Sequence, residues 1–84
     1  MLKPTIHMNG TSREELLDQL CKAGAALRDA MGALAEASPN GRDYYVQGDG
    51  AIRQALAEHA ARREKLAEVL KEIEELAEHV ADAP

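Results

Sequence analysis

The sequence predicts an all-α fold: an antiparallel helical hairpin of two long helices with a short extended N-terminal arm, packing as an oligomeric helical bundle. Ala, Leu, Glu, Lys and Arg dominate the 84 residues, with no Phe, no Trp and only two Tyr, a composition typical of long packed helices. Apolar residues recur at steps of three and four along two long segments, which is the spacing of one helix face. A Pro-Asn-Gly stretch separates the two segments.

The first residues of this single domain, 1–11, are predicted to form an extended arm. Pro4 fixes its own φ and disfavours helical backbone at Lys3. Asn9-Gly10 is a turn signal between the arm and the helix that follows. We expect the arm to cover one end of the hairpin, in its own subunit or in a neighbour, with its apolar side chains Leu2, Ile6 and Met8.

The first helix is predicted over residues 12–37. Thr11 and Ser12 each precede a Glu by three residues, so two overlapping capping boxes are available at its start. Gly24 stands in the apolar seam, where glycine costs about 1 kcal/mol relative to alanine, and this predicts a close approach of another backbone. The heptad-spaced seam consists of Leu17, Leu20, Gly24, Leu27, Met31 and Leu34.

A loop is predicted over residues 38–50 and the second helix over residues 51–82. Proline just past a helix and glycine at a position of positive φ are typical of a helix end, and Pro39 and Gly41 fit that pattern. The seam of the second helix steps by four and three through Ile52, Leu56, His59, Arg63, Leu66, Leu70, Ile73, Ala77 and Val80.

The lengths of the two helices predict that the hairpin is not self-sufficient. At 1.5 Å per residue they span roughly 39 and 48 Å. Folding back from the loop places Ser12 opposite Glu74, so Leu76 and Val80 lack a partner within the hairpin. Two helices alone do not enclose so wide a seam, and we expect a dimer that forms a four-helix bundle, or a higher oligomer.

Composition excludes several classes of function. One cysteine, Cys21, rules out an internal disulfide, and the histidines show no metal-ligand spacing, so neither metal nor cofactor is expected; Cys21 itself is predicted to be a small buried residue. The net charge of −5 argues against DNA or RNA as a partner. No apolar run reaches the length of a membrane span, and no signal peptide is recognised, so a soluble, cytoplasmic protein is expected. The sequence shows no arrangement of a nucleophile with a general base, so we do not expect the protein to be an enzyme.

The loop between the helices is the candidate ligand-binding site. It is longer than a turn between helices requires, which is about 2–8 residues, and it holds both tyrosines. Tyrosine stacks on a flat ligand, arginine binds phosphate or carboxylate, and amides read polar edges. The alternative is that the tyrosines only cover the end of the bundle. The candidate residues are Asn40, Arg42, Asp43, Tyr44, Tyr45 and Gln47.

Two polar residues interrupt the seam of the second helix, His59 and Arg63. The favoured interpretation is a polar layer that fixes register, paired with acidic residues such as Asp29 or Glu36. The functional alternative is that they line an intersubunit pocket and supplement the tyrosine loop as further ligand contacts.

Two segments of the chain carry a resemblance to known proteins: Pro4-Thr5-Ile6-His7-Met8-Asn9-Gly10-Thr11-Ser12 and Pro39-Asn40-Gly41-Arg42-Asp43-Tyr44-Tyr45-Val46-Gln47. With these segments the chain resembles a family of short uncharacterised proteins of tailed phages and prophages of proteobacteria. The resemblance covers most of the chain. It implies a phage origin and a location in the cytoplasm of a bacterial host, but it does not imply an activity. By analogy of architecture, small helical phage proteins include oligomeric sponges that sequester nucleotide immune signals.

Three functions are therefore expected in order. The first is an oligomeric accessory protein that sequesters an anionic, nucleotide-like small molecule through the tyrosine loop. The second is an inhibitor or adaptor that uses the same loop on a host protein. The third is a structural or assembly component of a phage.

Overall fold

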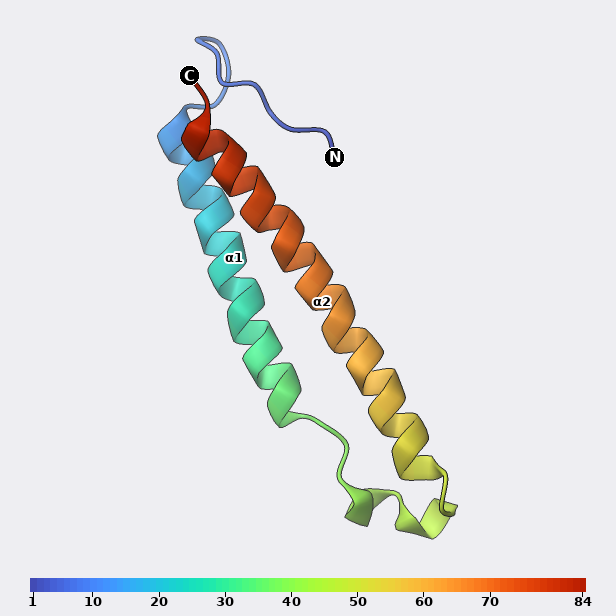
Figure 1. Cartoon of the computed structure of the whole chain (residues 1–84). Coiled ribbons are helices and arrows are strands. Elements are labelled where there is room, and N and C mark those ends of the chain that lie inside the picture. The colour runs from blue at the N-terminus through green and yellow to red at the C-terminus, as the bar shows by residue number, and fades with distance from the viewer.

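The computed structural model describes residues 1–84 and shows two long helices folded back on each other, with no strand (Figure 1). Helix α1 spans Arg13–Glu36 and helix α2 spans Ala51–Asp82. Two short 3-10 turns, η1 at Gly41–Asp43 and η2 at Tyr45–Gln47, lie in the connection. The molecule is a rod of 61 × 20 × 17 Å, with both termini at one end and the loop at the other (Figure 1). The predicted helical hairpin is confirmed.

Local hydrogen bonds explain where the helices begin and end. Ser12 caps α1, because its Oγ accepts the Glu15 N–H at 3.2 Å. At the other end of α1, the Ala37 N–H donates to carbonyls of the preceding turn, which satisfies acceptors that a helix end leaves free. Gly48, with φ of 109°, is the single residue of positive φ, a conformation that glycine adopts without a steric penalty. It lets the chain turn into α2.

The register of the two helices differs from the one that helix lengths predicted. The Arg13 guanidinium donates to the Ala83 carbonyl, so α1 begins opposite the very end of α2 and not opposite Glu74. Glu74 instead pairs with Arg28 at 3.6 Å. The connection is no tight turn: it runs beyond the end of α1 alongside the first turns of α2 (Figure 1). The unequal lengths of the helices are therefore absorbed at the loop end.

Burial follows from this register. Val80 is fully buried and Leu76 half-buried, so the prediction that these turns lack a partner within the hairpin is wrong. Of the arm's three apolar side chains, Ile6 is half-buried whereas Leu2 and Met8 are exposed. Only four of the 84 residues are buried: Gly24, Ala55, His59 and Val80.

Two seam-related predictions also need correction. Cys21 is exposed, because it lies at the edge of the contact between the helices and not within it. Gly24 is buried, yet a Cβ at this position would meet Arg28 Nη1 at 3.6 Å and Ile73 Cγ2 at 3.9 Å. These are ordinary contact distances, so the helices do not approach closely enough to require glycine. No helix of the structure is both long and apolar enough to span a membrane.

Candidate functional site at the loop end of the hairpin

The loop is held in shape by its own hydrogen bonds. Asn40 Oδ1 accepts the Arg42 N–H at 3.0 Å, which starts the first 3-10 turn as an Asx turn does. The Tyr44 N–H then donates to the Gly41 carbonyl at 3.1 Å, and the Gln47 N–H donates to the Tyr44 carbonyl at 2.9 Å. Two successive turns thus hold the segment between the helices in a defined conformation.

The two tyrosines face different surroundings. Tyr44 is half-buried and, with Gln47, lines a shallow cleft of about 130 Å³ against the first turns of α2. Tyr45 is 75% exposed and its neighbour Val46 is 76% exposed. Each of the two interpretations of the loop therefore fits one of the two tyrosines. Tyr44 covers the end of the hairpin, and Tyr45 is exposed to solvent.

The cleft beneath Tyr44 is not an anion site within one chain. Its α2 wall includes the carboxylate of Glu58, and no basic residue lines it. Arg42 forms no ion pair and lies outside the cleft. The remaining predicted polar contacts are exposed and flank the tyrosines in sequence: Asn40, Asp43 and Gln47.

The structure separates His59 from Arg63 and from the loop site. Arg63 is exposed, whereas His59 is 6% exposed. The Nε2 of His59 lies 2.7 Å from the Leu34 carbonyl, and because a carbonyl only accepts, Nε2–H is the donor. The predicted pairing of His59 with Asp29 or Glu36 is wrong: the ring satisfies a backbone acceptor in the last turn of α1 instead.

Two further contacts of this kind close the opposite end of the rod, and the sequence analysis missed both. Arg13 donates to the Ala83 carbonyl, and His79 Nε2–H donates to the Pro4 carbonyl at 2.8 Å, which holds the arm against α2. One signal for Arg13 was available, since it stands seven residues before Leu20 on the seam of α1. The contact of His79 with the arm has no periodic signal.

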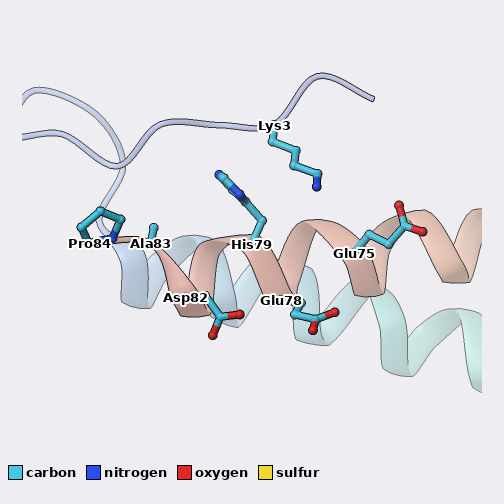
Figure 2. Close-up of a pocket in the computed structure, with 7 residues that line it drawn as sticks. All are labelled: Lys3, Glu75, Glu78, His79, Asp82, Ala83 and Pro84. Atoms are coloured by element: carbon cyan, nitrogen blue, oxygen red, sulfur yellow. The ribbon is translucent and has the colours of Figure 1, made fainter.

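The largest hollow lies at this terminal end, between the arm and α2 (Figure 2). His79 extends from α2 toward the arm and Lys3 extends from the arm back over α2 (Figure 2). The groove has a volume of about 370 Å³, and three of its seven lining residues are acidic, namely Glu75, Glu78 and Asp82. No set of three or more His, Cys, Asp or Glu side chains is arranged to hold a metal ion.

One side chain with a shifted pKa lies away from both ends of the rod. Asp18 accepts a hydrogen bond from Lys22 at 2.8 Å, and this bond, with the attraction between the two charges, raises the pKa of Lys22. The pair is exposed and lies on the outer surface of α1, so it takes no part in the loop site.

Comparisons of the chain with protein-family models, with characterised proteins and with solved structures find no match. The function is therefore inferred from the site itself.

Proposed function

We propose that the protein is a non-enzymatic binding module that self-associates and captures a host protein through its loop, as an inhibitor or adaptor. The observation that carries the proposal is the exposed pair Tyr45 and Val46, 75% and 76% exposed on a hydrogen-bonded loop. An aromatic and an aliphatic side chain held outward at the end of a rod contribute apolar contact area at a small cost in backbone entropy.

The chemistry of the loop fits a protein partner better than a small ligand. Tyr and Arg are the residue types that dominate binding energy at protein interfaces, and Arg42 stands in the same loop, exposed and free of an ion pair. The cleft of about 130 Å³ is smaller than the roughly 300–1,000 Å³ of small-molecule sites. Glu58 in its wall also disfavours an anionic ligand.

A second candidate function is sequestration of an anionic nucleotide-like molecule, which would use a different pair of loop residues. Arg42 is available for a phosphate and Tyr45 for stacking on a base. One chain does not enclose such a ligand, so this function needs a second copy to complete the site. The resemblance to short phage proteins supports a role in a bacterial host for either candidate.

A capture experiment tests the first function. The immobilised protein is incubated with bacterial lysate, and retained proteins are identified by mass spectrometry. The double variant Tyr45→Ala, Val46→Ser should lose a protein that the wild type retains. The matched control is Leu2→Ser, Met8→Ser, which removes two exposed apolar side chains at the opposite end and should retain that protein. Identical retention by all three forms would contradict the proposal.

Calorimetry separates the second function from the first. The protein is titrated with a panel of cyclic nucleotides and ADP-ribose derivatives, alongside the variant Arg42→Ala. Saturable heat with the wild type that is lost in Arg42→Ala would replace the first function by the second. Absence of binding heat with every member of the panel would exclude these nucleotides as ligands.

A further inference from the structure

Each helix carries an additional apolar line beside the seam that closes the hairpin. On α1, three residues spaced by seven lie one position from the seam and form one flank: Leu16, Ala23 and Ala30. On α2, Val69 and Leu76 share this spacing and lie just before Leu70 and Ala77 of the seam. Residues seven apart recur on the same side of a helix. Each helix can therefore pack against a second neighbour.

The two additional lines lie on the same side of the hairpin. The ion pair of Arg28 with Glu74 marks one side of the contact between the helices. At 100° per residue, Ala23 and Ala30 lie on the other side of α1 from Arg28, and Val69 and Leu76 lie on the other side of α2 from Glu74. One side of the hairpin is therefore bridged by the ion pair, and the other presents an apolar strip. On α2 this strip is continued toward the loop by Arg62, seven residues before Val69. This open face consists of Leu16, Ala23, Leu27, Ala30, Val69 and Leu76.

Exposure shows that the open face lacks a cover within the chain. Val69 is 45% exposed and Ala30 is exposed, whereas Leu16, Leu27 and Leu76 are each half-buried. The arm does not reach across it: the arm lies at the terminal end of the rod, where the Pro4 carbonyl accepts a hydrogen bond from His79 (Figure 1). Half-buried leucines along both helices indicate a surface that is completed by another molecule.

We propose that a second copy of this chain packs on the open face in antiparallel orientation. The proposal rests on the self-association stated above and adds its surface and direction. A strip as long as α1, whose 24 residues span roughly 36 Å, and 20 Å wide has an area on the order of 700 Å². Specific interfaces bury about 600–1,000 Å² per partner, and the estimated area of the face falls within this range.

The orientation follows from the distribution of charge along α2. Residues 51–66, near the loop, carry four basic and two acidic side chains, whereas residues 67–82, near the termini, carry one basic and six acidic side chains. A parallel dimer would place the two acidic ends together, and like charges in contact are unfavourable. An antiparallel dimer places the acidic half of each α2 beside the basic half of the other.

The open face continues into the cleft of the candidate site. Ala51, Ala55 and Glu58 form the α2 wall of that cleft, and at 100° per residue they lie on the same side of α2 as Val69. The terminal end of the second copy then lies beside the Tyr44 cleft of the first. The dimer therefore builds each loop site from two chains, which is the enclosure that one chain lacks.

Pulsed electron resonance between spin labels tests the orientation. In a Cys21→Ser background, Asp49→Cys places a label at the loop end. Glu68→Cys places one near the middle of α2, at an exposed position about 100° from Val69 around the helix. The antiparallel dimer predicts a long distance at residue 49, comparable with the 61 Å rod, and a much shorter one at residue 68. A short distance at residue 49 would show a parallel dimer and overturn the proposal.

Matched variants test the surface. Val69 and Leu56 are both 45% exposed, but Leu56 lies on the side of α2 that carries Glu74. Val69→Asp should abolish the dipolar signal at residue 68 and Leu56→Asp should retain it; the reverse result would overturn the proposal. Ala30→Glu, an exposed site in mid-helix, provides a second disruption of the face if Val69→Asp fails to fold.

The labelled proteins also separate this inference from the proposed function. Absence of any dipolar signal from the wild-type face would overturn the dimer and the self-association together. Capture through Tyr45 and Val46, measured on the same protein, would stand or fail independently.

Discussion

At the scale of single residues, the hairpin depends on side chains that satisfy backbone carbonyls. His59 is the clearest case, because it is 6% exposed and donates to the Leu34 carbonyl in the last turn of α1. The last carbonyls of a helix lack intrahelical donors, so a donor from the facing helix both satisfies one of them and fixes the register. The imidazole performs this role without a carboxylate partner.

Replacing His59 tests this role. His59→Leu keeps an apolar volume but removes the donor, and we expect a loss of about 1–2 kcal/mol in the free energy of unfolding. His59→Gln, which retains an N–H, should lose less. Urea unfolding followed by circular dichroism measures both changes. A His59→Leu protein as stable as the wild type would show that the bond contributes nothing.

Replacing the buried glycine of α1 should change the free energy of unfolding in the opposite direction. A Cβ at Gly24 would lie at ordinary contact distances from Arg28 and Ile73, and alanine is favoured over glycine within a helix by about 1 kcal/mol. Gly24→Ala should therefore raise the free energy of unfolding by about 0.5–1 kcal/mol. Gly32, which has open space around it, is the reference: Gly32→Ala should give a similar gain. A destabilised Gly24→Ala alone would indicate tighter packing of the helices.

At the scale of elements, the loop has two parts with separate roles. Tyr44 packs on the first turns of α2, whereas Tyr45 extends away from the protein. The part of α2 that continues past the end of α1 has no helical neighbour there, so the loop provides its cover. Stability and binding should consequently depend on different residues of one short segment.

Single alanine changes at the two tyrosines test this division. Tyr44→Ala should lower the free energy of unfolding by about 1–3 kcal/mol, as removal of a partly buried aromatic side chain does. Tyr45→Ala should stay within about 0.5 kcal/mol of the wild type, as surface substitutions do, and lose partner capture. Thermal unfolding and the capture assay supply the two measurements. Equal destabilisation by both changes would show that the loop is only a cover.

Sequence periodicity predicted the elements but not how they meet. Heptad spacing is a property of each helix alone, so it predicts two long helices and the seam through Leu20 and Ile73. Register depends on the path of the loop, which is set by the Asn40 turn and by Gly48, and helix lengths contain no information about it. The contacts of Arg13 and His79 with distant carbonyls depend on that register, so they were missed with it. The exposure of Tyr45 beside the half-buried Tyr44 follows from the 3-10 turns of the loop, which the spacing of apolar residues does not predict.

At the scale of the whole molecule, the rod contains almost no core. Four of its 84 residues are buried, and one of these is a glycine and another a histidine. Small domains with marginal cores are commonly stabilised by a disulfide, a metal or association with other chains. Because the one cysteine is free, we propose that a second copy on the open face supplies this stabilisation.

Light scattering coupled to size exclusion, repeated over a hundredfold range of protein concentration, tests that claim most directly. The chain has a mass of 9.1 kDa, and we expect a mass at least twice this at the higher concentrations. The mass should return to 9.1 kDa in Val69→Asp but not in Leu56→Asp. A wild-type protein that remains helical at 9.1 kDa across the whole range would contradict it.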